Sequence, residues 1–467
     1  MTVRVRFAPS PTGKLHVGNV RTALLNMLYA RQQNGTFVLR FEDTDEDREV
    51  VGAEESMLEV LSWLGLVPDE SPFHGGDYGP YRTMERDARG DYKKALQTLF
   101  DKGMAYECFV SKEELDMIRR LRTSRGLPPG YDNRHRDLSE AEKAKYRAEG
   151  RQPVIRFKLL DGPIVFDDLV RGKVQYLAEN LGGDPVIVRS NGVPTFAFGG
   201  AVDDINQDIT LVIRGEDHVT NTASQVRIFE ALDATPPQFA HISLMLDSDG
   251  GKLSKRLDSL SIVQLRAQGY LPNAICSYLA AVGTSMDPTP GDLQQLAQKF
   301  NFSAMGRAPV RFDLEQVTRL NATLLREMDW AAVKPYLMPF LDGVKANEGD
   351  LEAFWLAIRH NVNLLSEVRS QVDLCFGDIT PATLAEDDRA FVRTAAETLP
   401  KGPYTSTTWN EWVNALKTQT GRKGKALFMP LRLALTGEEH GPELADLLPV
   451  LGEQKARDRL AKAAGGN

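Results

Sequence analysis

The stretch VRVRFAPSPTGKLHVGNVRTALLNMLYARQQNGTFVLRF, from Val3 to Phe41, decides the fold of this chain. Its first five residues alternate like a strand, and the proline- and glycine-rich APSPTG that follows predicts a loop. Apolar residues then recur at i, i+3, i+4, i+7 and i+8 from Val20 onward, which predicts a helix with Asn19 as its N-cap and Gly35 as its stop. The closing TFVLRF predicts a buried strand. Such a β-α-β unit favours two parallel neighbouring strands in a doubly wound sheet.

The rest of the chain changes pattern several times. From about Tyr81, charged helices, an arginine-rich Gly/Pro stretch and strand-like pieces predict an insertion. Strand patterns resume at DPVIVRSNGVPTFAF and DITLVIRGEDH, and AHISLML predicts one more buried strand. After about residue 320 the pattern is helical. We therefore expect an α/β domain over residues 1–81 and 185–251, an α+β insertion over 82–184, a connecting region over 252–325 and an all-α half over 326–467.

The composition is that of a globular protein with several buried cores. Its 467 residues, 42% of them hydrophobic and 26% charged, suffice for two to four domains. No apolar run approaches the roughly 18 residues of a membrane span, so we expect a cytoplasmic protein without a membrane partner. Three widely spaced cysteines predict neither a disulfide framework nor a Cys-x-x-Cys metal knuckle. A net charge of -8 confines any nucleic-acid contact to basic patches such as RRLRTSR and GRKGK, which are otherwise solvated surface runs.

The loop before the predicted helix combines features of a phosphate site. Gly13 and Gly18 have the spacing of a P-loop, but Asn19 stands where the lysine of that loop belongs. A helix N-terminus offers backbone N–H groups and a partial positive charge, Gly18 allows close approach, and His16 can donate its imidazole N–H to a phosphoryl oxygen. This combination favours a nucleotide that is attacked at its α-phosphate. The alternative is a structural histidine that caps a turn.

A second element, SDGGKLSKR from Ser248 to Arg256, places cationic side chains on a glycine-hinged loop directly after the predicted strand AHISLML. Such a loop can close over a triphosphate and neutralise charge that develops in the transition state. A solvated basic turn is the alternative. The two elements together point to a nucleotide site more specifically than either does alone.

Five motifs, in order and spacing, now carry a resemblance: APSPTGKLHVGN, LRFEDTD, GPYRTMER, VIRGEDHVTNT and KLSKR. They resemble the signature set of the class I aminoacyl-tRNA synthetases, and specifically of the bacterial glutamyl-tRNA synthetases. His16 to Asn19 resembles the family's HIGH element, and Lys252 to Arg256 its KMSKS element. RFDLEQVTRLN and GKALFMPLRLALTGEEHGPEL extend the resemblance over essentially the whole chain. It implies a Rossmann-type catalytic domain, an inserted acceptor-binding domain, a stem-contact region with the KLSKR loop, and a helical anticodon-binding half.

The resemblance also implies the reaction and its nucleotide site. L-Glutamate and ATP, which brings Mg²⁺ with it, would give glutamyl-adenylate and pyrophosphate, and glutamate would pass to the 3′-terminal adenosine of tRNA-Glu, with tRNA-Gln left open as a second acceptor. His16, Lys252 and Lys255 would be the catalytic residues. The substrate's own carboxylate attacks, so no side chain need act as nucleophile. The residues implied to bind ATP are Gly18, Asn19, Asp217, Ser254, Lys255 and Arg256.

Glutamate recognition requires a group that separates a carboxylate from the isosteric amide of glutamine. An arginine does this, because its planar fork pairs with a carboxylate bidentately and stays charged. By resemblance, Arg6, Ser10 and Arg214 face the substrate, and Glu42 takes its α-amino group. The alternative for Arg6 and Glu42 is ion pairing at strand edges.

The sequence departs from the family in two places. The family's PTY element reads GVPTFAF here, so Phe196 removes a substrate-facing hydroxyl from the glutamate site. Some relatives carry a zinc knuckle in the insertion, whereas here Cys108 is followed by Val110 at the second ligand position and His135 is the only later candidate. Two ligands are too few for a closed tetrahedral site, so we predict no zinc.

Three functions stay open at this stage. The first is glutamyl-tRNA synthesis by a monomeric enzyme whose insertion holds the tRNA acceptor end and whose helical half reads the anticodon, with Arg359 as a candidate reader or else a surface arginine. The second is glutamylation of a modified tRNA base, although such an enzyme would lack the helical half. The third is a catalytically inactive tRNA-binding paralogue. A glutaminyl-specific synthetase is disfavoured because its resemblance would call for β-barrels.

Overall fold

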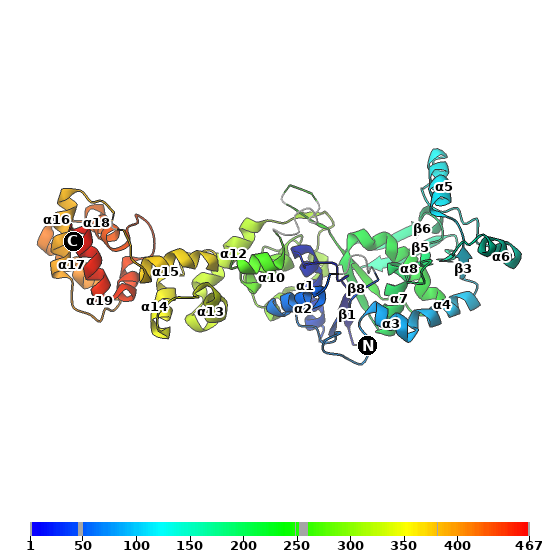
Figure 1. Ribbon diagram of the computed structural model, residues 1–467, viewed down its shortest axis with the longest axis horizontal. Coiled ribbons are helices and arrows are strands. Elements are labelled where there is room, and N and C mark those ends of the chain that lie inside the picture. The colour runs from blue at the N-terminus through cyan, green and yellow to red at the C-terminus, as the bar shows by residue number, and fades with distance from the viewer. Residues whose placement is uncertain (1, 45–49, 248, 252–259, 381, 466–467) are drawn as a thin grey trace. The chain divides into compact units, whose positions relative to one another are not determined.

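The computed structural model describes residues 2–44, 50–247, 249–251, 260–380 and 382–465. The chain forms two compact units, the first made of residues 1–264 and 276–313 and the second of residues 265–275 and 314–467. Their helices and strands are labelled in Figure 1.

The opening of the first unit is the predicted β-α-β unit. Strand β1 (Arg4–Phe7) is followed by helix α1 (Val17–Gln32) and strand β2 (Thr36–Leu39). The two strands pair in parallel, with Arg6 opposite Val38. All four residues of β1 are buried, and the apolar side of α1 packs on both strands. The hydrophobic periodicity therefore predicted this unit correctly.

Both predicted ends of α1 were wrong in detail. The N-cap is His16 and not Asn19, because the imidazole accepts hydrogen bonds from the first backbone N–H groups of the helix. The helix ends at Gln32, and Asn34 takes the left-handed conformation with φ of 50°. Gly35 has a different role: a Cβ there would lie 2.4 Å from the carbonyl oxygen of Val3, so its lack of a side chain lets β1 and β2 approach.

The central sheet contains four hydrogen-bonded strands in the order β6-β5-β9-β8. Strands β8 and β9 run parallel, joined by helix α8, and β5 joins β9 in parallel through the pair Asp168–Phe239. β6 pairs with β5 antiparallel as a hairpin. The backbone N–H of Thr210 donates to the carbonyl of Arg4 at 2.9 Å, which connects the start of β8 to β1. The bounds are β5 (Pro163–Asp168), β6 (Gly172–Leu177), β8 (Leu211–Gly215), α8 (Val219–Ala231) and β9 (Gln238–Ile242).

The segment predicted as an α+β insertion contains both helices and strands. Its strands β3 and β4 form an antiparallel three-stranded sheet with β7. Its hairpin β5–β6 belongs to the central sheet. The bounds are α3 (Thr83–Arg89), α4 (Asp91–Asp101), β3 (Ala105–Cys108), α5 (Lys112–Ser124), α6 (Glu140–Ala148), β4 (Val154–Phe157) and β7 (Val186–Val188).

Two predicted strands have a different structure. GVPTFAF does not continue a strand, because helix α7 (Phe196–Asn206) begins at Phe196. AHISLML is split into β9 and the two-residue β10 (Met245–Leu246), which pairs in parallel with β11 (Val310–Arg311). Short apolar runs do not distinguish one strand from two or from a helix start, since the periodicity is the same over so few residues.

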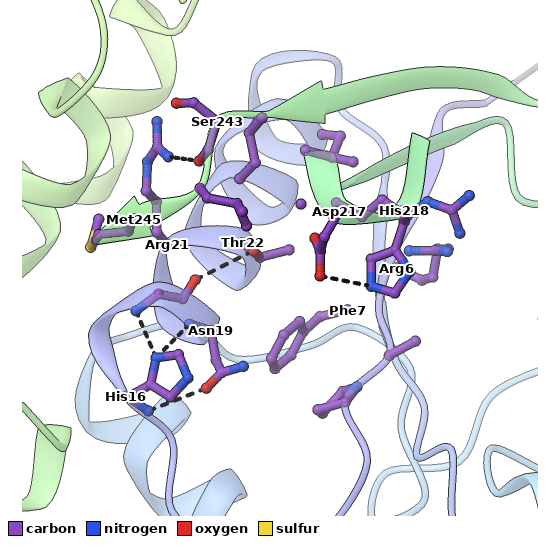
Figure 2. Close-up of a pocket in the computed structure, with 18 of the residues that line it drawn as sticks. Arg6, Phe7, His16, Asn19, Arg21, Thr22, Asp217, His218, Ser243 and Met245 are labelled. Carbon is purple, nitrogen blue, oxygen red and sulfur yellow. Dashed lines mark hydrogen bonds and ion pairs between the residues drawn. The ribbon is translucent and has the colours of Figure 1, made fainter. Parts of the chain in front are cut away.

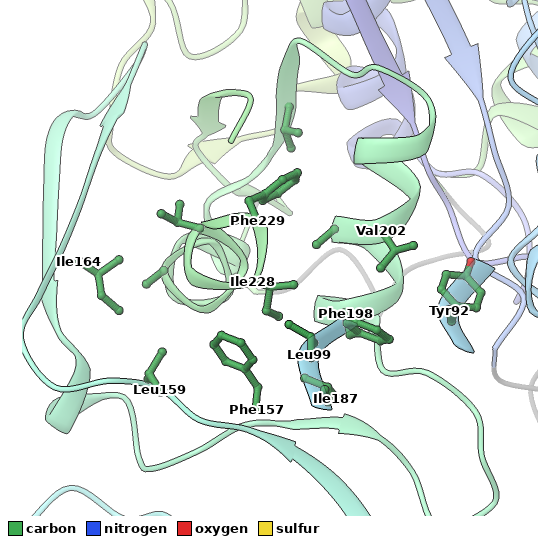
Figure 3. Packing of buried hydrophobic residues seen from close by; sticks show 14 of the residues in the cluster. Tyr92, Leu99, Phe157, Leu159, Ile164, Ile187, Phe198, Val202, Ile228 and Phe229 are labelled. Atoms are coloured by element: carbon green, nitrogen blue, oxygen red, sulfur yellow. The ribbon is translucent and has the colours of Figure 1, made fainter. Parts of the chain in front are cut away.

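A hydrophobic core holds α7 and α8 against the strands (Figure 3). Phe198 and Val202 of α7 meet Ile228 and Phe229 of α8, and Phe157 of β4 lies in the same cluster. These five side chains are at most 3% exposed, so each contributes its full apolar area to the core. The core therefore fixes the helix that begins at Phe196.

The second unit is helical from residue 314 onward, with no strand among its described residues. This confirms the predicted all-α half and, with the mixed sheet of the first unit, the predicted fold class. None of the helices that the structure describes is long and apolar enough to cross a membrane. The bounds are α12 (Leu314–Glu327), α13 (Trp330–Leu337), α14 (Glu348–Ile358), α15 (Val368–Phe376), α16 (Glu386–Thr398), α17 (Thr408–Thr420), α18 (Lys425–Thr436) and α19 (Leu444–Ala463). The helices between the β-rich part and α12 are α9 (Ile262–Ala267), α10 (Pro272–Ala281) and α11 (Leu293–Lys299), and α2 (Ala53–Trp63) follows β2.

Candidate active site

A pocket of about 430 Å³ lies at the carboxyl ends of β1, β8 and β9, beside the first turn of α1 (Figure 2). Ligands of open α/β sheets bind in such a crevice, outside the carboxyl ends of the strands. In Figure 2, His16 and Asn19 lie on one flank of the pocket, with Asp217, His218 and Arg6 on another. The predicted site residues that line it are Arg6, His16, Gly18, Asn19, Glu42, Phe196, Arg214 and Asp217.

The other predicted site residues lie elsewhere or outside the described part of the chain. Ser10 is exposed and does not line the pocket. Arg359 belongs to the second unit, where its guanidinium donates to the carbonyl of Met328 at 3.2 Å. Its anticodon contact stays a prediction. The KLSKR residues Lys252, Ser254, Lys255 and Arg256 lie outside the described residues.

His16 joins the first turn of α1 to the pocket. Its Nδ1 accepts hydrogen bonds from the backbone N–H groups of Gly18 at 3.1 Å and Asn19 at 3.4 Å. Burial lowers the pKa of the ring, so His16 is neutral at pH 7 and carries its one proton on Nε2. His16 therefore caps the helix, which was the alternative considered in the sequence analysis. The two backbone N–H groups donate to its ring. The Nε2–H remains as a donor for a ligand.

Residues before and after 252–259 connect to the same pocket, the first directly and the second through His16. Met245 and Leu246 of β10 line it, and the chain then turns through Gly250, whose φ is 82°. On the far side, Ser261 forms an antiparallel β-bridge with His16. Thus strand β10, which precedes position 252, lines the pocket, and Ser261, which follows position 259, pairs with the histidine.

Arg6 and Glu42 belong to a buried network of charges. Arg6 pairs with Asp204 at 3.1 Å, and Arg40 lies 2.6 Å from Asp204 and 3.4 Å from Glu42. The ion pairing considered for Arg6 and Glu42 is therefore real, but it lies in the interior, with Asp203 as a further carboxylate 3.7 Å from Arg40. Burial raises the pKa of Glu42 to about 7, although Arg40 and Arg6 lower it.

Arg214 differs from those arginines because its hydrogen-bond partners are uncharged. Its Nη2 donates to Thr222 Oγ1 and to Gln225 Oε1, each at 2.6 Å, and its Nε to His241 Nε2 at 3.3 Å. No carboxylate of the described residues forms an ion pair with it. Burial lowers the pKa of Arg214 to about 9, which leaves it charged at pH 7. The carboxylates that act on Arg214 do so only at longer range, and they belong to Asp204, Glu42 and Asp217. A buried guanidinium without a carboxylate in direct contact favours an anionic ligand.

Several lining residues were missed in the sequence. His218 stacks on Phe196 with ring centroids 4.8 Å apart, and its Nε2 lies 3.7 Å from the Asp217 carboxylate. Burial first, and then the charge of Arg214, lower the pKa of His218 to about 4, so the ring is neutral.

Arg21 also lines the pocket, and its Nη1 donates to the Ser243 carbonyl at 2.9 Å. One feature of the sequence indicated that Arg21 has a role: it is a charged residue next to the buried face of a predicted amphipathic helix.

The insertion offers a poor set of metal ligands. His135 Nδ1 accepts the backbone N–H of Phe109 at 3.1 Å, so that nitrogen serves the backbone. Burial raises the pKa of Cys108, but hydrogen bonds with His135 and Tyr131 outweigh it and bring the pKa to about 7. No group of three or more His, Cys, Asp or Glu suited to a metal occurs among the residues that the structure describes.

Comparisons with known proteins show the class to which the chain belongs. The family model "tRNA synthetases class I (E and Q), catalytic domain" matches residues 2–318, and an anticodon binding domain model matches residues 330–464. Among curated relatives, glutamate–tRNA ligase 2 of Hyphomonas neptunium is 45% identical over 458 residues, covering 98% of this chain and 99% of that protein. Glutamate–tRNA ligase 1 of Maricaulis maris is 45% identical over 464 residues, covering 99% of each.

A solved structure agrees with these relatives. The crystal structure of a glutamate tRNA ligase from Elizabethkingia meningosepticum, in complex with its amino acid, superposes with a TM-score of 0.87 and is 33% identical, covering 100% of this chain and 99% of that one. The chain therefore belongs to the glutamate–tRNA ligase family of the class I tRNA synthetases.

Proposed function

We propose that the chain is a glutamate–tRNA ligase that activates L-glutamate with ATP and then transfers it to the 3′-terminal adenosine of tRNA-Glu. The observation that carries this proposal is Arg214: a buried guanidinium, paired only with neutral groups, on the wall of a pocket shared with His16. A carboxylate ligand would supply a directly paired negative charge. Family membership agrees with this ligand, since the relatives are named for glutamate.

In this proposal the glutamate lies between Arg214 and Glu42. The side-chain carboxylate of the substrate pairs with Arg214, and Arg6 adds positive charge from the neighbouring strand. Glu42 accepts a hydrogen bond from the α-ammonium group. Glutamine would leave the buried Arg214 opposite a neutral amide, which costs about 3 to 5 kcal/mol and disfavours it by about two to four decades. Ser10, which is exposed, would reach the substrate only through a rearrangement of its loop.

The nucleotide would lie toward His16. The His16 Nε2–H donates to an ATP phosphate, near the backbone of Gly18 and Asn19, and Asp217 lies by the nucleotide. The glutamate carboxylate attacks the α-phosphorus, pyrophosphate leaves, and cations stabilise the charge that develops. Lys252, Lys255 and Arg256, with Ser254, are proposed to supply that stabilisation. The position of Met245, Leu246 and Ser261 around their segment supports this role. Mg²⁺ arrives as part of the ATP substrate.

The tRNA is proposed to use the remaining parts of the chain. Residues 82–184 would hold the acceptor end, 252–325 the stem, and 326–467 the anticodon, with Arg359 as a reader of one base. The match of the anticodon binding domain to residues 330–464 supports the last assignment. We take the enzyme to act as a monomer in the cytoplasm, where its substrates are.

The decisive experiment is glutamate-dependent ATP–pyrophosphate exchange with tRNA present, followed by charging of tRNA-Glu and tRNA-Gln transcripts. We expect exchange with glutamate and little with glutamine, and stable charging of tRNA-Glu. The absence of exchange under every tRNA condition, with tRNA binding retained, would instead indicate an inactive tRNA-binding paralogue. Charging of tRNA-Gln decides whether the enzyme is discriminating.

A further inference from the structure

A buried row of polar groups leads from strand β5 to the pocket. Asp168 Oδ2 lies 2.6 Å from His241 Nδ1, and His241 Nε2 lies 3.3 Å from Arg214 Nε. Asp168 is 3% exposed, His241 0% and Arg214 6%. Because water does not reach these atoms freely, each depends on its protein partners for hydrogen bonds. Asp168 also ends β5 at the register pair through which β5 joins β9.

The carboxylate fixes which nitrogen of His241 carries the proton. Asp168 Oδ1 accepts the backbone N–H groups of Val170 at 2.9 Å and Arg171 at 2.7 Å, and Oδ2 also accepts the backbone N–H of His241 at 3.0 Å. Burial raises the pKa of Asp168, but these bonds and His241 outweigh it, so the group is ionised. An ionised carboxylate only accepts, so Nδ1 of His241 carries the proton. Nε2 is then an acceptor that faces the N–H of Arg214.

The other contacts of Arg214 restrict its guanidinium further. Thr222 Oγ1 accepts from Nη2 of Arg214 and lies 2.8 Å from His241 Nε2, and Gln225 Oε1 also accepts from Nη2. Among the residues that the structure describes, the hydrogen bonds of Arg214 thus use Nε and Nη2, and Nη1 remains for a ligand. A His241 with a proton on Nε2 would set one N–H against another and disturb this arrangement.

We propose that Asp168 and His241 are positioning residues for substrate recognition: they hold Arg214 from behind, so that its remaining N–H groups meet the substrate's side-chain carboxylate. The inference rests on the proposed function, because it takes glutamate to be the ligand of Arg214. It assigns a role in amino acid recognition to a residue of β5, which lies in the segment predicted as the acceptor-binding insertion.

The first test is Asp168→Asn. An asparagine amide in this place donates to His241 Nδ1, so the ring proton moves to Nε2 and faces Arg214. We expect the glutamate KM to rise about 10- to 100-fold, as for a lost hydrogen bond to a charged group. The ATP KM should change far less, whereas the melting temperature should fall, because the amide also faces the backbone N–H of His241 that Oδ2 accepts in the wild type. Nitrogen NMR of ¹⁵N-histidine-labelled protein should show the His241 proton on Nδ1 in the wild type and on Nε2 in the variant.

Two substitutions at His241 distinguish the contribution of Nε2, which faces Arg214, from that of Nδ1, which faces Asp168. His241→Gln can place an amide oxygen near the position of Nε2, which retains an acceptor for Arg214, whereas His241→Asn reaches only toward Asp168. We expect the glutamine variant to keep a lower glutamate KM than the asparagine variant. The control is His74→Gln, since His74 is an exposed histidine of the same unit that does not line the pocket. It should leave the glutamate KM unchanged.

The outcomes are distinct. An unchanged glutamate KM in folded Asp168→Asn would overturn the inference. Equal fold increases in the glutamate KM and the ATP KM would also overturn it, because those indicate a structural role alone. A wild type without exchange or charging activity would overturn the proposed function instead. In that case the proton position in ligand-free wild type and Asp168→Asn still tests the hydrogen-bond arrangement.

Discussion

His16 and Ser261 face each other in an isolated antiparallel β-bridge, although most of the first unit separates them in the sequence. The backbone N–H of Val17 also donates to the carbonyl of Leu260 at 3.3 Å. The start of helix α1 is therefore joined to Leu260 and Ser261, while strand β10 lines the pocket that His16 also lines. The described residues on either side of positions 252–259 are thus connected to one pocket, directly or through His16.

Lys255→Ala should reduce ATP–pyrophosphate exchange by orders of magnitude, because it removes a charge proposed to stabilise the α-phosphorus and the leaving pyrophosphate in the transition state. tRNA binding, measured by filter binding, should stay nearly intact. Arg31→Ala removes a surface cation that pairs with Asp69 and serves as the control. Undiminished exchange in Lys255→Ala would rule out the assigned role.

Arg214→Ala should raise the glutamate KM about 100-fold or more, since it removes the guanidinium whose Nη1 is proposed to pair with the substrate carboxylate. The ATP KM should change little. Arg227→Ala, on helix α8 and paired with Glu230, removes an arginine that does not line the pocket and should leave both values unchanged. A glutamate KM that Arg214→Ala does not alter would count against this ligand.

The raised pKa of Glu42 should make activity rise and stability fall as the pH increases. This pKa is raised from 4.5 to about 7 by burial, and in the proposed site the charged form of Glu42 accepts a hydrogen bond from the α-ammonium group. kcat/KM for glutamate should therefore rise with pH up to about 7 and level off above it. Stability contributed by Glu42 should fall over the same window, because the folded state binds more protons there than the unfolded state. Glu42→Gln should flatten both profiles. Identical profiles for wild type and variant would exclude Glu42 as their origin.

Phe196→Tyr should restore a hydroxyl at the wall of the glutamate pocket. The ring can keep its stacking on His218, so the added hydrogen bond should lower the glutamate KM about 2- to 10-fold and sharpen the preference over glutamine. Phe428→Tyr, at an exposed position of the second unit, adds the same group away from the pocket. A higher KM in Phe196→Tyr would show that the hydroxyl has no partner there.

Metal analysis tests the prediction that the insertion holds no zinc. Protein purified without affinity-tag metals should contain far less than one equivalent of zinc, because Cys108 and His135 are the only candidate ligands of the altered knuckle. The Cys108→Ser variant should have the same metal content. One equivalent in the wild type that disappears in this variant would contradict the prediction.

Local patterns were sufficient for much of the fold. The helical spacing from Val20 onward and the flanking apolar strands predicted the β-α-β unit, and the loop before it singled out His16. The relation of Asp168, His241 and Arg214 was not predictable in this way, because three separate strands bring these residues together. The start of α7 at Phe196 was missed for a related reason: a short apolar run takes its conformation from tertiary packing, here from the core around Phe198.

The two ring nitrogens of His16 have separate roles. Nδ1 accepts hydrogen bonds from the first turn of helix α1, and Nε2 remains as a donor for a ligand in the pocket. An alanine at this position would remove both nitrogens at once, so its effect on rate would mix a frayed helix with the loss of the proposed phosphate contact. Few side chains can replace the imidazole, because a substitute must cap the helix and still extend a donor beyond it. Because one side chain both caps helix α1 and provides the donor, few substitutions at this position can preserve the fold and the activity together.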